Sequence, residues 1–149
     1  MEKDVREYFS APQWTEDEAR GQNPLVLAYI GDGVYEVFVR SKILHRKEKV
    51  SRLHRASAEH AKASAQAEIA LKLEPLFTEE EAAIFKRGRN THQKTMAKHA
   101  TVADYRNATG FECLIGYLYT SGQSERLRTY FTEIERIWDD ERPKSFLFP

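Results

Sequence analysis

The chain has little cysteine, no net charge and no secretory start, and each absence excludes a class of protein. Its single cysteine among 149 residues, Cys113, excludes an internal disulfide and a zinc site built from cysteines. Lysine plus arginine and aspartate plus glutamate both number 23, so the surface as a whole is not a nucleic-acid binder, although neutrality permits a local basic patch. No apolar run follows a basic start, so we expect no secretory signal and a cytoplasmic protein.

Strand signals are also missing, because no segment alternates between polar and apolar residues over a useful length. Helical periodicity is frequent instead, and the length suits one domain with a sizeable core. We therefore predict an all-α fold. The expected helices span residues 23–44, 50–73, 78–88, 102–119 and 124–138, and we expect an N-terminal strap at 1–22, a main domain at 23–138 and a C-terminal tail at 139–149.

The predicted helix at 23–44 is the stretch around which the chain is organised. Asn23 is a good N-cap, and Pro24 suits the first turn. Apolar residues fall on nearly every face, which predicts a buried helix, yet Asp32 lies inside it between two glycines. Buried aspartates are rare unless they are paired or bind metal. Gly31 and Gly33 each cost about 1 kcal/mol in a helix, so we expect something to approach the backbone closely there.

A second acid, Glu112, lies in the most apolar part of the predicted helix at 102–119. Two acids in two core helices can be brought together when the helices face each other. Such a pair fits a divalent-metal site, because Mg²⁺ keeps several waters and takes only one or two protein carboxylates. The five histidines all lie in polar segments without a paired nucleophile, so catalysis by histidine is less attractive.

Positive charge is concentrated in one segment, since residues 82–103 contain no acid. We read its second half mainly as a loop, and a long loop in a small domain is often functional. The anion that it meets is expected to be a nucleic-acid backbone. The candidate RNA-binding residues are Lys86, Arg87, Arg89, Asn90, Lys94 and Lys98.

Two motifs resemble those of the ribonuclease III family. LAYIGDGVYEVFV, at 27–39, resembles the family's signature helix, and TGFECLIGYLY, at 109–119, resembles its second helix. Together with KRGRN at 86–90, they are most similar to the short Mini-III subgroup, which consists of the catalytic domain alone. The resemblance covers roughly residues 23–121 and implies a ribonuclease III-like helical bundle.

The resemblance implies a role for several residues. It places the family's catalytic and metal-binding acids at Asp32 and Glu112, with Mg²⁺ as the cofactor. Two accessory acids of full-length ribonuclease III are replaced by Ala28 and Thr109, as in the Mini-III subgroup. A homodimer is also implied, with Tyr29 packed at the dimer interface. The implied activity is hydrolysis of double-stranded RNA, with precursor 23S ribosomal RNA as the substrate.

Two other hypotheses stay open beside this one. The chain could be a catalytically inactive double-stranded-RNA-binding module of the same fold, although retention of both acids speaks against it. It could instead be an unrelated helical nucleotide pyrophosphohydrolase, but the paired glutamate motifs of that class are missing. The acidic run at 79–81 is explained by a capping box between Thr78 and Glu81, and Glu36 by a helical ion pair with Arg40.

Overall fold

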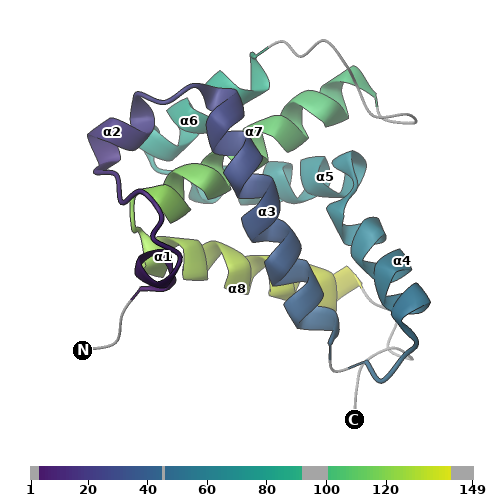
Figure 1. Cartoon of the computed structure of the whole chain (residues 1–149). Helices are drawn as coiled ribbons and strands as arrows, with labels where there is room; N and C mark the ends of the chain where they lie inside the picture. The colour runs from purple at the N-terminus through teal and green to yellow at the C-terminus, as the bar shows by residue number, and fades with distance from the viewer. Residues whose placement is uncertain (1–3, 45, 92–100, 142–149) are drawn as a thin grey trace.

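The structure, a computed structural model of the chain, describes residues 4–44, 46–91 and 101–141. Every regular element in these ranges is helical, which confirms the predicted all-α fold. Figure 1 shows the helices gathered around α7. In chain order the elements are α1 (Val5–Tyr8), α2 (Glu16–Arg20), α3 (Pro24–Ile43), α4 (Val50–Ala61), α5 (Ala63–Leu73), the 3₁₀ turn η1 (Glu74–Leu76), α6 (Glu79–Arg89), α7 (Val102–Thr120) and α8 (Ser124–Glu141).

Helix α7 is the central element, packed by α3, α5 and α6. All its residues from 108 to 118 are buried except Glu112, which is partly exposed. Helix α3 packs one side against α7 and leaves the other exposed, with Tyr29 83% accessible. The expectation that the helix at 23–44 is buried on all sides is therefore wrong. The predicted caps are correct, since Asn23 accepts a hydrogen bond from the Leu25 amide and the predicted capping box between Thr78 and Glu81 forms.

Several predicted helix boundaries are wrong, and the helix expected to end at 138 continues as α8 to Glu141. The helix expected at 50–73 is divided at Lys62, whose extended backbone (ψ 155°) separates α4 from α5. The helix expected to stop at Gly88 continues to Arg89, with Asn90 as its C-cap. Gly88 is a packing residue, because a Cβ there would lie 2.8 Å from the Cys113 Cβ and 2.9 Å from the Gly110 Cα of α7.

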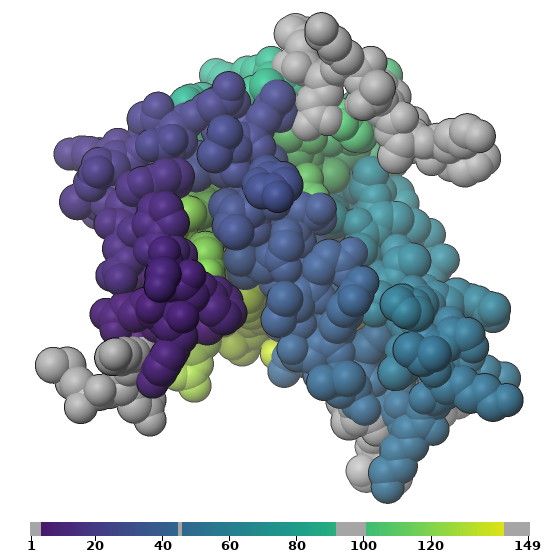
Figure 2. Space-filling model, in the orientation of Figure 1, coloured from purple at the N-terminus to yellow at the C-terminus, as the bar shows by residue number. Residues whose placement is uncertain are grey.

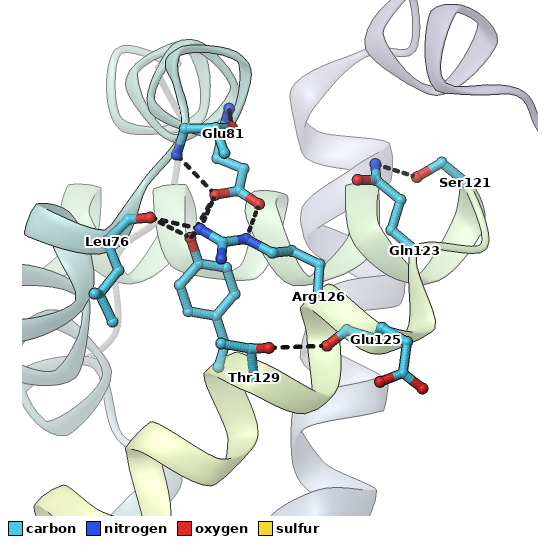
Figure 3. A network of polar contacts seen from close by, with 9 residues as sticks. Leu76, Glu81, Ser121, Gln123, Glu125, Arg126 and Thr129 are labelled. Carbon is cyan, nitrogen blue, oxygen red and sulfur yellow. Dashed lines mark hydrogen bonds and ion pairs between the residues drawn. The ribbon is translucent and has the colours of Figure 1, made fainter.

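A partly buried ion pair between Glu81 and Arg126 connects α6 to α8, as Figure 3 shows. Glu81 accepts hydrogen bonds from Arg126 at 2.8 and 2.9 Å, and both groups also contact the Tyr130 hydroxyl. Burial alone would raise the pKa of Glu81, but hydrogen bonds from Arg126, Tyr130 and the Thr78 amide outweigh it and hold that pKa below its usual range. Because this acid has its own cation, it is accounted for as part of the scaffold.

The N-terminal segment packs against the end of α7. Arg6 is 8% exposed, and its Nη1 donates a hydrogen bond of 2.8 Å to the Thr120 carbonyl. The Trp14 amide donates to the same carbonyl at 3.1 Å. The turn that follows uses Gly122 with a positive φ of 74°, where a side chain would be strained. Within the described ranges, no helix is long and apolar enough to cross a membrane.

Candidate active site

The site is built where α3 crosses α7 with their backbones in contact. A Cβ on Gly31 would overlap the Glu112 carbonyl oxygen and lie 2.8 Å from the Gly116 amide nitrogen. On the other helix, a Cβ on Gly116 would overlap the Leu27 carbonyl oxygen. The group that approaches Gly31 is thus α7 itself. Nothing in the described chain lies within 4 Å of a Cβ built on Gly33, so the shared explanation expected for both glycines is wrong.

This crossing brings the two predicted acids together. Asp32 follows Gly31 on an exposed part of α3, and Glu112 is partly buried on the facing side of α7. The pKa of Glu112 is raised to about 9, first by burial and then by a side-chain hydrogen bond and charge repulsion with Asp32. A bound cation would favour the ionised form of both acids. The expectation that Asp32 is buried is wrong, because this residue is exposed to solvent.

Gln66 of α5 is a third polar residue at the site, and the sequence analysis missed it. Its side chain opposes the other effects and lowers the pKa of Glu112. Its Nε2 donates a hydrogen bond of 2.7 Å to the Ala61 carbonyl. Gln66 is only 3% exposed, and its Oε1 is buried without a hydrogen-bond partner. The only sequence signal was one large polar residue in an alanine-rich helix, which is weak because an exposed position would look the same.

The donor set fits Mg²⁺ better than a metal that needs a full protein cage. The described residues contain no cluster of three or more histidine, cysteine, aspartate or glutamate side chains that could hold a metal. Two carboxylates open to water on one side are sufficient for Mg²⁺, which retains several waters. Ala28 and Thr109 are both buried, and the Thr109 hydroxyl donates to the Tyr105 carbonyl of its own helix at 3.0 Å. Neither residue is placed to replace an accessory acid.

The predicted basic cluster divides into two kinds of residue. Arg87 donates from Nη1 to the Arg20 carbonyl and from Nη2 to the Gln22 carbonyl, so it fixes the chain before α3. Lys86 and Arg89 instead line a pocket of about 510 Å³, whose wall includes Phe77 and Phe85. Asn90 is a helix cap at the end of α6. Lys94 and Lys98 lie outside the described residues.

An apolar stripe runs along the exposed side of α3. Figure 2 shows this helix in blue on the viewer's face of the molecule. We call this the α3 stripe, and its members are spaced at helical intervals. Their accessible fractions range from 46% to 83%, so the described chain does not cover them. The α3 stripe consists of Val26, Tyr29, Val37 and Leu44.

The residues around this crossing also match known proteins. Residues 25–123 match the ribonuclease III domain, a span that contains both acids. A Mini-ribonuclease 3 of Clostridium tetani is 41% identical over 138 residues, which cover 91% of each chain. A Mini-ribonuclease 3 of Symbiobacterium thermophilum is 48% identical over 105 residues, which cover 70% of this chain and 81% of the relative.

A solved structure agrees with the fold. The crystal structure of protein FN1578 from Fusobacterium nucleatum superposes with a TM-score of 0.73 at 27% identity, covering 78% of this chain and 94% of that one. The domain match spans the helices that carry Asp32 and Glu112, and the relatives extend the likeness over most of the chain. The chain therefore belongs to the ribonuclease III family, within its Mini-ribonuclease 3 group.

Proposed function

We propose that the chain is a Mg²⁺-dependent endoribonuclease that hydrolyses phosphodiester bonds in double-stranded RNA. The observation that carries this proposal is the pairing of Asp32 and Glu112 where the backbones of α3 and α7 touch. A structural pair would have a cation of its own, as Glu81 has in Arg126. Glu112 instead faces another acid, and its pKa is raised by burial first and by Asp32 second.

Asp32 and Glu112 would hold the metal, and each has a distinct part. Asp32 is exposed and can reach a phosphodiester group from solvent, whereas Glu112 is fixed by its packing on α7. When bound, Mg²⁺ would polarise a phosphoryl oxygen and lower the pKa of the attacking water. The close backbone contact holds together the two helix segments that carry these carboxylates, which helps to position a reacting group.

The α3 stripe supports a homodimer. An exposed apolar surface of this kind marks an interaction site, and a twofold axis along α3 would bury the stripe against its own copy. Tyr29, its most exposed member, is the residue we assign to the centre of the interface. The dimer would present two identical acid pairs to one duplex, so that each pair cuts one strand.

Lys86 and Arg89 are the described cations that we assign to the RNA backbone, with Asn90 beside them. Duplex RNA is recognised largely through its shape, phosphates and 2′-hydroxyls, so a few cations suffice without a helix that reads bases. Lys94 and Lys98, from the same segment without acids, stay predicted RNA-binding residues. Arg87 is removed from the set, because its two terminal nitrogens donate to backbone carbonyls of the chain before α3.

The proposed substrate is precursor 23S ribosomal RNA, and the proposed catalytic domain comprises residues 23–138. The segment at 1–22 would serve as a strap, since Arg6 and Trp14 tie it to α7. The other candidate, a catalytically inactive RNA-binding module, needs no paired acids. Mapping the product ends after incubation with purified precursor RNA tests the choice of substrate.

Cleavage of a labelled RNA duplex, with Mg²⁺ and then with excess EDTA, tests the activity. We expect cleavage only with Mg²⁺, and none by Asp32→Asn, whose exposed side chain can change without disturbing the fold. Duplex binding without cleavage under either condition would favour the inactive module. Cleavage by Asp32→Asn at the wild-type rate would remove Asp32 from the site.

A further inference from the structure

The pocket beside α6 is lined by described residues that take no part in the proposed metal site. Its volume is about 510 Å³, within the roughly 300–1,000 Å³ that is usual for ligand sites. Leu71 of α5, Pro75 of η1 and Phe77, which follows η1, supply apolar surface. Leu71 is 53% accessible, and Phe77 is half-buried, with its ring centroid 5.4 Å from that of Phe85. The pocket therefore offers apolar surface that the described chain leaves open.

Positive charge lies beside this apolar surface. Lys86 and Arg89 are three residues apart on one face of α6, and both belong to the lining. Among the residues that the structure describes, neither is in an ion pair, and the Arg89 Cζ lies 5.8 Å from the centre of the Phe85 ring. The described lining contains one acid, Glu74 of η1, so its cations outnumber its acids. This combination suits a ligand that carries an anionic group next to an apolar body.

A fully paired RNA duplex has no group that would fill such a pocket. Its bases are stacked and paired inside the helix, so it presents mainly phosphates and 2′-hydroxyls to a protein. Lys86 and Arg89 can bind phosphates, but the apolar wall beside them would stay in water. An unpaired nucleotide differs, because its base can leave the stack while its phosphate stays attached. Such bases bind to apolar and aromatic side chains, and arginine adds a cation–π contribution.

We propose that this pocket binds the base of an unpaired nucleotide in the RNA substrate, with Lys86 and Arg89 on the adjoining phosphates. This inference rests on the proposed function, in which the same two cations bind the RNA backbone. Phosphates are alike along a duplex and carry no sequence information, so they do not select one position on it. A nucleotide held in the pocket selects one position, and so sets which phosphodiester bond reaches Asp32 and Glu112.

The test combines duplexes that contain one unpaired nucleotide with variants of two adjacent alanines. Ala82 is an exposed residue of the lining, so Ala82→Phe fills the pocket from a helical position. Ala83→Phe is the matched control, because Ala83 is also helical and exposed but lies outside the lining. The unpaired nucleotide is moved one position at a time through a turn of the duplex. Affinities for these RNAs and for the fully paired duplex are measured in EDTA, so that the RNA stays uncut.

At the position where the unpaired nucleotide reaches the pocket, we expect the wild type to bind about tenfold more tightly than to the paired duplex. Ala82→Phe should lose this preference, and Ala83→Phe should keep it. In Mg²⁺, the wild-type cut should move along the RNA in step with the unpaired nucleotide.

Equal wild-type affinity for all of these RNAs would overturn the inference and favour an acidic peptide as the ligand of the pocket. That comparison needs no variant, so it stands even where a substitution disturbs the fold. Equal loss of the preference in Ala82→Phe and Ala83→Phe would overturn it as well. Failure of the proposed function looks different, because the wild type would then cut none of the RNAs in Mg²⁺, whatever their relative affinities.

Discussion

The Glu112 carboxyl lies partly buried beside Asp32, so its ionisation depends on what else is bound there. Its pKa is raised from 4.5 to about 9 by burial first and by Asp32 second. An acid with a raised folded-state pKa stabilises the protein below its unfolded pKa and loses that contribution as the pH rises through the folded value. The metal-free protein should therefore lose stability between about pH 4.5 and about pH 9.

Mg²⁺ should reverse this trend, because it binds the ionised pair in the folded chain and not the unfolded chain. Thermal melts at about pH 5, 7 and 9, with Mg²⁺ and with EDTA, measure the effect on wild type and on Glu112→Gln, across the range that the raised pKa defines. The variant cannot ionise at this position, so its melting temperature should depend less on pH and should not rise with Mg²⁺. If the melting temperatures of the two proteins depended on pH in the same way, the pH-dependent loss of stability would not come from Glu112.

The basic residues of α6 should separate into two classes. Neutralising Lys86 and Arg89 together should weaken duplex binding and lower the slope of log affinity against log salt, because fewer counterions are released. Arg87→Gln should instead lower stability by about 1–3 kcal/mol, since it removes a charged donor from two carbonyls. Binding isotherms at several salt concentrations and melts of each variant decide this. A salt slope that changes only with Arg87 would contradict the division.

The sequence predicted the two acids of the site but not the amide beside them. Asp32 and Glu112 stand out in the sequence because a charged residue in an apolar helix is unusual, whether it is buried or exposed in the fold. Gln66 carries no charge and lies among alanines, so nothing in the sequence distinguished it from an exposed residue. Arg87 was predicted to act with its basic neighbours because charge alone cannot reveal that a guanidinium faces backbone carbonyls of the same chain.

Among the elements, the crossing of α3 and α7 should be the least tolerant of added atoms. Gly31→Ala places a methyl group against the Glu112 backbone, which cannot yield like a flexible side chain. We expect a loss of about 3 kcal/mol, together with lower activity per folded molecule, because the two acids are carried apart. Gly33→Ala is the matched control two residues away.

A Cβ at Gly33 meets nothing in the described chain within 4 Å, so this change should stabilise α3 by about 0.5–1 kcal/mol. Chemical denaturation of both variants, with the assembly state checked by light scattering, gives the comparison. Equal destabilisation by the two alanines would mean that the crossing is not the reason for Gly31.

Helix positions were predictable because capping residues and apolar spacing are local, whereas two boundaries depended on contacts from elsewhere. The chain around Lys62 contains neither proline nor glycine, so local propensity favoured one helix. Hydrogen bonds from Tyr35 and Gln66 stabilise the break instead. Gly88 looked like a helix end, but close packing on Gly110 keeps it inside α6.

For the molecule as a whole, the α3 stripe predicts assembly into a dimer. Tyr29→Lys should leave the helical content unchanged and shift the protein to a monomer, because it places a charge at the proposed apolar interface. Phe9→Lys is the control, as Phe9 is also exposed (69%) but lies outside the stripe. Analytical ultracentrifugation measures both. Dissociation by Phe9→Lys alone, or a monomeric wild type, would contradict the assignment.

The fold class and the order of the helices were predicted, but the identity of the central helix was not. The apolar composition of residues 23–44 suggested that this helix is enclosed, whereas α7 occupies that place and α3 keeps one side exposed. Composition cannot distinguish a helix buried within its own chain from one that a second copy would cover.

The backbone contact between α3 and α7 also has a consequence for how the molecule opens. At Gly31 and Gly116 the nearest atoms of the facing helix belong to the backbone, which cannot rotate aside and admit water. The amide protons of Leu27, Gly31 and Gly116 should therefore exchange with deuterium only when the whole domain unfolds, at the free energy of global unfolding. Faster exchange there than in the rest of α7 would reveal a partial opening. If the crossing opens only in that event, the two carboxylates keep their spacing for as long as the protein is folded.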